Sequence, residues 1–231
     1  MIRNIFIAVT LWLSLLSAVQ AQNNPVVIEL YTSQGCSSCP PADAYLHQNL
    51  AKRDDVIALA LHVDYWDYIG WKDEFADPAN TARQKQYANA AGHRTVYTPQ
   101  MIINGQDHVV GAHPDKVEKL ISVHKDRATP VTLDVKKAGK MVIIQAQTQT
   151  PGAMQVHLVQ YTPERHVSIK RGENAGKMLT YGNIVNLWET VATWNGQSAL
   201  SMKAETDGEG PIVVLIQSVK GGPILAAARL D

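Results

Sequence analysis

The sequence predicts an α/β domain followed by an antiparallel β domain. Three observations lead to this expectation. Apolar runs and helical patterns alternate between residues 26 and 124, short alternating strands follow from Thr129, and the first residues have the character of a signal peptide. We therefore expect a signal peptide over residues 1–21, an α/β domain over 22–128 and a β domain over 129–231.

The composition permits folded cores and excludes several classes of protein. Of the 231 residues, 45% are apolar and 18% are charged, which is typical of globular domains rather than of disordered or collagen-like chains. Lys and Arg together number 21, as do Asp and Glu, and no long basic run occurs. Because nucleic-acid binding depends on clustered positive charge, we expect no nucleic-acid partner.

The amino-terminal segment predicts export. Arg3 precedes the apolar run Ile5–Leu16, and the small residues Val19 and Ala21 follow in the spacing of a signal-peptidase site. The apolar run is shorter than the roughly 20 residues that a membrane-spanning helix needs. We expect a periplasmic or secreted protein with no stable membrane insertion after cleavage, and the alternative is an uncleaved membrane anchor.

The first domain is expected to have the element order βαβαββα. The elements are a strand over Pro25–Tyr31, a helix from Ala42 to near Lys52, a buried parallel strand over Val56–Val63, a helix from Asp77 and Pro78 to Ala91, a hairpin of Met101–Asn104 with Val109 and Val110, and a helix from Pro114 with Val117, Leu120, Ile121 and His124 on one face.

The second domain is expected to contain seven short strands. They are Val131–Val135, Met141–Thr148, Met154–Tyr161, Leu187–Trp194, Ala199–Ala204, Ile212–Val219 and Ile224–Leu230. This pattern predicts a small antiparallel sandwich. Gly172–Lys177 has a superficial likeness to a phosphate-binding loop, but its spacing is one residue short and Met178 replaces the required hydroxyl residue. We expect a solvated connection there that leans on the first domain.

Cys36 and Cys39 are the only cysteines, and their spacing points to redox chemistry. In the loop-closure model, a disulfide across so short a loop stabilises a fold by only about 2 kcal/mol, against about 4.7 kcal/mol for a loop of a hundred residues. The same spacing suits a redox couple, because the second thiol can resolve a mixed disulfide that the first has formed. A metal-binding pair and an incidental local disulfide remain alternatives.

The junction between the first strand and the first helix is a favourable place for a reactive thiol. We expect Cys36 at a helix N-terminus, with the N–H groups of Ser38 and Cys39 directed at its sulfur. Pro40 and Pro41 are expected at the end of the first helical turn. The positive end of the helix dipole would lower the pKa of the Cys36 thiol.

These motifs resemble the thioredoxin superfamily, in which a Cys-X-X-Cys pair follows the first strand. Pro99 matches the proline that is cis in that superfamily and faces the disulfide. More closely, Ser33–Pro40, His62–Asp67 and Tyr97–Gln100 resemble a family of exported bacterial proteins with no settled activity. The resemblance implies a thioredoxin-like first domain with a helical insert near Asp64–Arg94, and a C-terminal all-β, sandwich-like domain.

The resemblance also supplies candidates for supporting roles. Thioredoxins bury a carboxylate six residues before the first cysteine, and Glu29, seven residues before Cys36, is the candidate proton acceptor for Cys39. The backbone of Thr98 would hold an extended substrate segment as an added strand beside Pro99.

The segment Asp64–Trp71 leaves the end of the second strand and is expected over the cysteines. Trp66 and Trp71 are candidates to line a cleft for an unfolded peptide, with Asp64 or Asp67 as a proton relay. The alternative is that both indoles simply pack the insert onto the domain. His62 is expected to be a hydrogen-bonded interior histidine.

The sequence predicts an exported thiol-disulfide oxidoreductase that needs no cofactor beyond its cysteine pair. Cys36 would attack a substrate disulfide, and Cys39 would resolve the mixed disulfide. The expected partners are protein thiols or disulfides and a redox-recycling membrane protein. The alternative is a copper(I) carrier, or metallochaperone, that adds a histidine such as His93 or His113 to the two thiolates.

Overall fold

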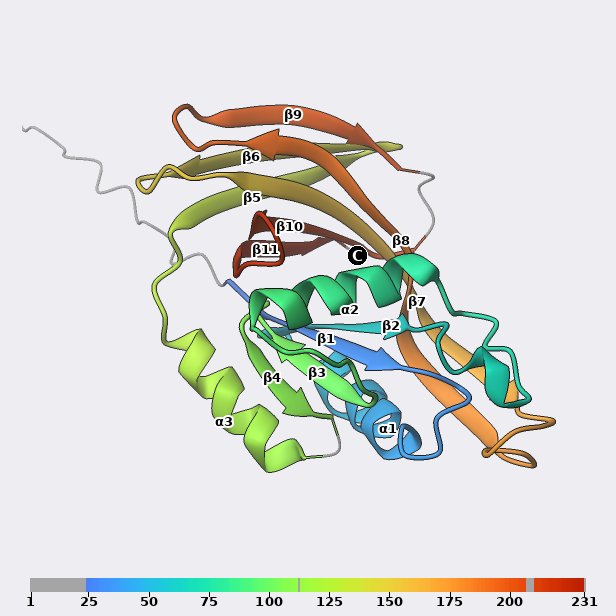
Figure 1. The fold of residues 1–231 in the computed structure, drawn as a ribbon. Coiled ribbons are helices and arrows are strands. Elements are labelled where there is room, and N and C mark those ends of the chain that lie inside the picture. The colour runs from blue at the N-terminus through green and yellow to red at the C-terminus, as the bar shows by residue number, and fades with distance from the viewer. Residues whose placement is uncertain (1–23, 112, 207–209, 231) are drawn as a thin grey trace, which may run out of the picture.

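Three α-helices and eleven β-strands make up the described part of the chain (Figure 1). This computed structural model describes residues 24–111, 113–206 and 210–230. The predicted signal peptide, residues 1–21, lies outside the described residues. No helix within the described ranges has the length and apolar character needed to cross a membrane. The molecule is a sheet-rich, mixed α/β protein.

The first half follows the predicted order of elements. Its elements are β1 (Val26–Thr32), α1 (Pro40–Gln48), β2 (Val56–His62), α2 (Pro78–Ala90), β3 (Gln100–Ile103), β4 (Asp107–Val110) and α3 (Pro114–Lys125), with short 3-10 helices at Leu50–Lys52 and Asp67–Ile69. The Asp77 carboxylate accepts a hydrogen bond from Ala79 N at 2.8 Å and caps α2. Asn104 and Gly105 have φ values of 46° and 67°, which the Asn-Gly turn between β3 and β4 requires.

The second half contains the seven predicted strands, but two of them are much longer than predicted. The strands are β5 (Val131–Ala138), β6 (Met141–Thr148), β7 (Met154–Ser168), β8 (Met178–Trp194), β9 (Leu200–Glu205), β10 (Ile212–Ser218) and β11 (Ile224–Leu230). β7 and β8 pair as far as Ser168 and Met178, and so form a long ribbon. Residues 163–166 are exposed and consist of a proline followed by three polar residues, so the sequence there lacks the apolar alternation that marks a strand.

One eight-stranded sheet runs through both halves of the chain. Its strand order is β11-β10-β7-β8-β2-β1-β3-β4, and a separate sheet has the order β5-β6-β9 (Figure 1). β1 is parallel to β2 and antiparallel to β3. The halves join where β8 pairs in parallel with β2 through Ala60 and Ile184. The sheet therefore continues across the expected boundary between residues 128 and 129, and the division into two domains remains a prediction.

Helices cover both faces of the sheet at its β1–β4 end. On one face, α1 and α3 pack through a cluster that includes Leu30, Leu46 and Ile121. On the other face, α2 packs through Tyr87 against Tyr31, in a cluster that also contains residues of β7, β8, β10 and β11. Because successive residues of a strand point to opposite faces, Leu30 and Tyr31 serve two different cores.

The smaller sheet packs on the β7–β10–β11 end of the large sheet. Their shared core includes Leu133, Ile144, Val156, Val214 and Trp194, all of them buried. Residues of β5 and β6 alternate between this core and the solvent, as expected for strands with one covered face. Two β layers therefore pack face to face here, and one of them belongs to the large sheet.

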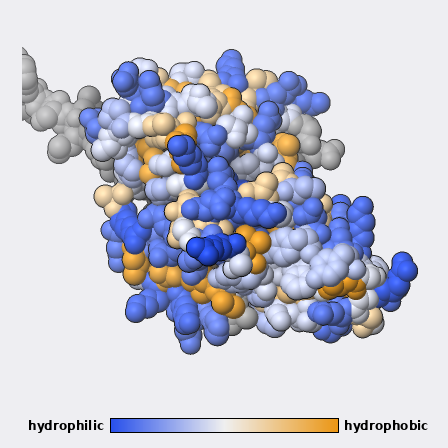
Figure 2. Space-filling view, viewed as in Figure 1, coloured by the Kyte–Doolittle hydropathy of each residue, from blue (hydrophilic) through white to orange (hydrophobic). Residues whose placement is uncertain are grey.

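The outer surface is mainly polar on the face shown in Figure 2, where small hydrophobic patches are scattered among hydrophilic residues. Among the described residues, the most exposed large apolar side chains are Tyr68 and Met178, at 81% and 67%. Such isolated apolar side chains are normal on protein surfaces.

Gly182 of β8 allows α1 to approach the ribbon. A Cβ on residue 182 would lie 2.6 Å from His47 Nδ1 and 3.1 Å from His47 Cα in α1. We expect Gly182→Ala to lower the free energy of unfolding by about 1–3 kcal/mol, because α1 must then move away from β8. Urea denaturation measures this change. Gly152→Ala is the control, since nothing lies within 4 Å of its Cβ position. Equal losses in the two variants would contradict the packing argument.

Candidate active site

Cys36 and Cys39 form a disulfide in the turn between β1 and α1. Cys36 N donates to Ser33 O at 3.1 Å, and Cys39 N donates to Cys36 O at 3.2 Å. These two turns follow directly on the end of β1 at Thr32. The disulfide therefore lies beyond the carboxyl ends of the parallel strands β1 and β2, where open α/β sheets place their ligand sites.

The first helix begins at Pro40, two residues before the expected Ala42 but four residues after Cys36. Cys39 is the N-cap, and Pro40 and Pro41 occupy the first positions of α1, where a missing N–H removes no helical hydrogen bond. The expectations that Cys36 starts the helix and that the prolines end its first turn are wrong. The Cys39 N–H, expected to point at the Cys36 sulfur, donates instead to the Cys36 carbonyl oxygen.

Thr98 and Pro99 precede β3 and are tied to the insert through Trp66. The Thr98–Pro99 peptide bond is cis, as the resemblance to thioredoxins implies. Trp66 Nε1 donates to Thr98 Oγ1 at 2.7 Å. The Trp66 carbonyl oxygen and Cβ lie 3.3 and 3.4 Å from the position that a Cβ on Gly35 would take. Trp66 thus links the residue before Cys36 to the residue before Pro99.

Trp71 binds the cysteine turn at Gln34, two residues before Cys36. Its Nε1 donates to Gln34 Oε1 at 2.8 Å, and Gln34 N donates to Asp73 Oδ2 at 2.8 Å. Trp66 and Trp71 are both partly buried. The two indoles therefore attach the insert to the turn that carries the cysteines.

The structure does not bring Glu29 to the cysteines. Glu29 is fully buried, and its two carboxylate oxygens accept hydrogen bonds from Arg83 at 2.7 and 2.8 Å. Tyr31 and Tyr87 donate to the same carboxylate. This network lies on the α2 face of the sheet, whereas α1, which starts after Cys39, packs on the opposite face. The alternation of side chains along β1 therefore turns Glu29 away from the disulfide.

Asp64 and Asp67 organise the insert. The Asp64 carboxylate accepts a hydrogen bond from the Thr81 hydroxyl in the first turns of α2. Asp67 Oδ1 accepts a hydrogen bond from Asp73 N at 3.1 Å, and burial raises the pKa of Asp67. The structure therefore connects these two carboxylates to α2 and to the loop before it rather than to the cysteines.

A buried carboxylate that the sequence analysis overlooked lies one helical turn after Cys39. Asp43 N donates to Cys39 O at 3.1 Å, and Asp43 is only 5% exposed. Its side chain is close to Thr32 and His62, at the carboxyl ends of β1 and β2. The four-residue spacing between Cys39 and Asp43 places both on one helix face, and this spacing is the signal that could have identified Asp43.

His62 and Asp73 extend this buried polar cluster. His62 Nδ1 lies 2.7 Å from Asp73 Oδ2, and both side chains are fully buried. His62 is thus the hydrogen-bonded interior histidine that the sequence predicts. Burial opposes a charge on His62, but the neighbouring Asp73 carboxylate outweighs it and raises the pKa of His62. The His62 ring also packs edge-on against Tyr181 of β8, with 5.0 Å between centroids.

Several polar atoms of this cluster have no protein partner. Among the described residues, no hydrogen-bond partner is found for the buried atoms Gln34 Nε2, His62 Nε2 and Tyr181 Oη, whereas the Thr32 hydroxyl lies close enough to the Asp43 carboxyl to lower its pKa. Burial raises the pKa of Asp43 to about 7, against the opposing effect of His62. Asp43 can therefore gain or lose a proton near neutral pH, one helical turn from Cys39.

The loop between β7 and β8 reaches over the disulfide. Asn174 Nδ2 donates to Gln34 O at 2.9 Å and to Cys36 O at 3.0 Å. Asn174 is 1% exposed, so this loop leans on the first half as expected, but its central residue is not solvated. Cys36 is 3% exposed and Cys39 is fully buried. No local sequence signal distinguishes Asn174, because its partners lie far away in the chain.

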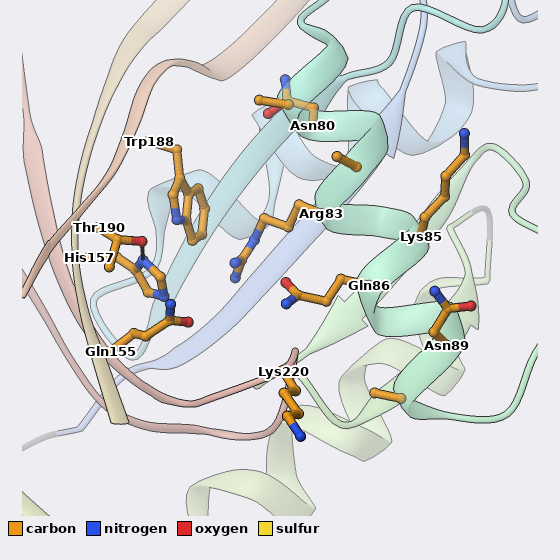
Figure 3. A pocket seen from close by; sticks show the side chains of 13 residues that line it. Asn80, Arg83, Lys85, Gln86, Asn89, Gln155, His157, Trp188, Thr190 and Lys220 are labelled. Atoms are coloured by element: carbon orange, nitrogen blue, oxygen red, sulfur yellow. Dashed lines mark hydrogen bonds between the residues drawn. The ribbon is translucent and has the colours of Figure 1, made fainter. Parts of the chain in front are cut away.

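A separate cleft of about 830 Å³ lies between α2 and the β7–β8 ribbon (Figure 3). Arg83 extends from α2 into this cleft, with its guanidinium 3.7 Å from the Trp188 ring centroid. His157 Nδ1 lies 3.1 Å from Thr190 Oγ1, and burial lowers the pKa of His157 to about 4. The described lining of this cleft includes neither cysteine, so it is distinct from the disulfide site.

The histidines considered as copper ligands lie elsewhere in the fold. His93 packs against His108 with 5.4 Å between ring centroids, and His113 is the N-cap of α3. In the parts of the chain that the structure describes, no group of three or more His, Cys, Asp and Glu side chains is placed to hold a metal ion.

Fold and site together define a mixed α/β protein with a buried Cys-X-X-Cys disulfide. The family described as "Protein of unknown function (DUF1223)" matches residues 27–217, and the chain belongs to this family. The crystal structure of protein AGR_C_4864 from Agrobacterium tumefaciens is similar, with 35% identity, a TM-score of 0.77, and coverage of 89% of this chain and 93% of that one. HBP35 of Porphyromonas gingivalis is similar in fold, with 13% identity, a TM-score of 0.62, and coverage of 90% and 74%. No curated protein sequence matches.

The raised pKa of Asp43 makes stability depend on pH. Burial raises this pKa from 3.8 to about 7, so the folded state binds the Asp43 proton more tightly than the unfolded state does, and stability falls progressively as the pH rises from about 4 to about 7. We therefore expect Asp43→Asn to be more stable than the parent protein at pH 8, by up to a few kcal/mol, and to gain much less at pH 5. Thermal unfolding of both proteins at both pH values measures this.

The control for this prediction is Asp115→Asn, which removes an exposed carboxylate from the first turn of α3. It should show the same difference from the parent protein at pH 5 and pH 8. If Asp43→Asn behaves in the same way as this control, the buried carboxylate does not titrate in this range.

Proposed function

We propose that this protein is an exported thiol-disulfide oxidoreductase whose first half is thioredoxin-like. The observation that carries the proposal is the Cys36–Cys39 disulfide at the β1–α1 junction, with the buried Asp43 one turn further along α1. The sheet order β2-β1-β3-β4, with α1 and α3 on one face and α2 on the other, supports the thioredoxin-like assignment. Export, in turn, suits a cysteine pair that is stable as a disulfide.

In this proposal Cys36 is the attacking thiolate and Cys39 is the resolving thiol. In the reduced protein, Cys36 Sγ attacks one sulfur of a substrate disulfide, a mixed disulfide forms, and the other substrate sulfur leaves as a thiolate. Cys39 then attacks Cys36 Sγ, the mixed disulfide breaks, and the second substrate sulfur leaves. Two electrons pass to the substrate, and the Cys36–Cys39 disulfide is restored. The reverse sequence oxidises a substrate dithiol.

Asp43 is the proposed proton acceptor for Cys39, in place of Glu29. A resolving thiol must lose its proton before it attacks, and a carboxylate with a pKa of about 7 can accept that proton at neutral pH. Glu29 is held in an ion pair with Arg83 on the other face of the sheet, whereas Asp43 follows Cys39 on the same helix. The neighbouring His62 stabilises the Asp43 carboxylate.

The proposed partners are protein or peptide thiols and disulfides, together with a membrane protein that recycles the cysteine pair. The bond from Trp66 to Thr98 supports a fixed edge beside Pro99, along which an extended substrate segment could pair with the backbone of Thr98.

Single cysteine substitutions test the mechanism. We expect Cys36→Ser to abolish disulfide exchange and Cys39→Ser to accumulate mixed disulfides, because the second variant can form the intermediate but cannot resolve it. The measurements are the reduction of insulin and of cystine by the reduced protein, and mass spectrometry of trapped intermediates. Full exchange activity in Cys36→Ser would remove the proposed mechanism. Stoichiometric copper in anaerobically purified protein would favour the carrier function instead.

The role of Asp43 predicts a pH dependence of the resolving step. In the parent protein, the rate at which Cys39 resolves a preformed mixed disulfide should rise as the pH passes through about 7, where the Asp43 carboxyl loses its proton. Asp43→Asn should lack this rise and should be about tenfold or more slower at pH 7.5. Stopped-flow measurements between pH 5.5 and 8.5 test this, with Asp115→Asn as control. An unchanged profile in Asp43→Asn would assign the proton to another group.

A further inference from the structure

Both cysteines are buried, and a loop from the second half of the chain binds the turn that carries them. Cys36 is 3% exposed and Cys39 is fully buried. Thiol-disulfide exchange requires an incoming sulfur to approach one of the two sulfurs along the line of the S–S bond. In the arrangement seen here, that approach is possible only where one of the walls around Cys36 can move.

The β7–β8 loop binds the backbone of the cysteine turn through Asn174 and Glu173, and Gly172 lies against Trp71 of the insert. Asn174 Nδ2 donates to the carbonyl oxygens of Gln34 and Cys36, and Ser37 N donates to Glu173 Oε2 at 3.3 Å. Lys177 Nζ donates to Asn174 Oδ1 at 2.9 Å and so orients the amide. The Asn174 amide therefore bridges the carbonyl oxygens of Gln34 and Cys36, the residues on either side of Gly35.

The loop itself has few attachments besides Asn174. Within residues 170–177, Asn174 is buried and the others are exposed, while Ile169 at the base of the loop is buried in the cluster against which Trp71 packs. Gly172 and Gly176 flank it with φ values of 78° and 82°, and nothing lies within 4 Å of a Cβ position on Gly176. Glycines in this conformation are common where a loop changes direction.

The other side chains near the cysteine turn, Trp66 and Trp71, are held in place by the core and by hydrogen bonds. Trp66 packs against the cluster beneath α2 and donates to Thr98, and Trp71 donates to Gln34. Moving either indole would disturb the insert and α2. Moving the loop tip breaks the bonds of Asn174 and Glu173 to the cysteine turn and the contact of Gly172 with Trp71, but it leaves α2 and the sheet in place, so the β7–β8 loop is the part of the site that moves most easily.

We propose that Asn174 is a specificity-determining residue, which favours exchange at Cys36 with low-molecular-weight disulfides and thiols over exchange with those of folded proteins while the loop is closed. This inference rests on the proposed oxidoreductase function. A small disulfide needs only a local displacement of the loop tip to reach the Cys36 sulfur. A disulfide on a folded protein brings a broad surface with it, and that surface must displace the whole loop from the cysteine turn.

Single-turnover oxidation of the reduced protein tests the inference, with oxidised glutathione as the small disulfide and insulin as the protein disulfide. Asn174→Ala should react about tenfold faster with insulin, because the two bonds that hold the loop are lost, and less than about threefold faster with glutathione. Asn186→Ala is the matched control, since this exposed asparagine of β8 bonds only to Thr162 within the ribbon. It should leave both rates unchanged.

Alkylation of Cys36 provides a readout that does not need catalysis. In a Cys39→Ser background, iodoacetamide and a maleimide on a 5-kDa polyethylene glycol compare a small reagent with a bulky one. The bulky reagent should gain about tenfold more from Asn174→Ala than the small reagent does. Lys177→Ala, which removes only an exposed side chain, should give a smaller change in the same direction. This variant keeps the test valid if Asn174→Ala does not fold.

The outcomes separate the inference from the proposed function. Equal acceleration for large and small reagents, or slower exchange in Asn174→Ala, would overturn the assignment of Asn174 as a specificity determinant. If no disulfide oxidises the reduced protein while bulky labelling still depends on Asn174, the loop is a cover, but the oxidoreductase function and the substrate restriction are both wrong.

Discussion

The parallel pairing of β8 with β2 is the interaction on which the geometry of the site depends. β2 pairs with β1, and β1 leads directly into the cysteine turn. Because β8 pairs with β2, the β7–β8 ribbon extends alongside that turn. Asn183 strengthens the junction by donating from Nδ2 to Ala58 O at 2.9 Å. The loop that ends the ribbon then meets Cys36 through Asn174. The second half of the chain is therefore part of the disulfide site.

The two buried carboxylates Glu29 and Asp43 differ in how completely the polar atoms around them are hydrogen-bonded. Glu29 accepts hydrogen bonds from Arg83, Tyr31 and Tyr87, and such a satisfied network fixes the position of α2 against the sheet. Asp43 lies near the buried atoms Gln34 Nε2, His62 Nε2 and Tyr181 Oη, which lack partners within the part of the chain that the structure describes, and each such atom costs about 1–3 kcal/mol of stability. An apolar cluster would be more stable there. Perturbed groups beside a reactive pair are typical of functional sites, and this favours Asp43 over Glu29 as the proton acceptor.

The sequence predicts those features that depend on neighbouring residues. The capped start of α2 at Asp77, the Asn104-Gly105 turn and the Cys36–Cys39 pair all carry local signals, and the structure contains each of them. The facing of Glu29 depends on the register of β1 against two helices, and the bonds of Asn174 join residues 138 and 140 positions apart. Periodicity and motif spacing describe neither kind of relation. For this reason the sequence predicts the cysteine pair and the cis position of Pro99 but indicates neither the facing of Glu29 nor the bonds of Asn174.

Burial links the redox state of the cysteine pair to its protonation. Reduction breaks the Cys36–Cys39 bond and adds two electrons, so the pair either takes up protons or carries new negative charge. A site in which Cys39 is fully buried and Asp43 is 5% exposed solvates such charge poorly. Asp73 already places one carboxylate there, balanced by His62. A second and a third anion next to it would repel each other strongly, because a low dielectric strengthens charge interactions. We therefore propose that proton uptake accompanies reduction in this site, with Asp43 as the group that couples the two.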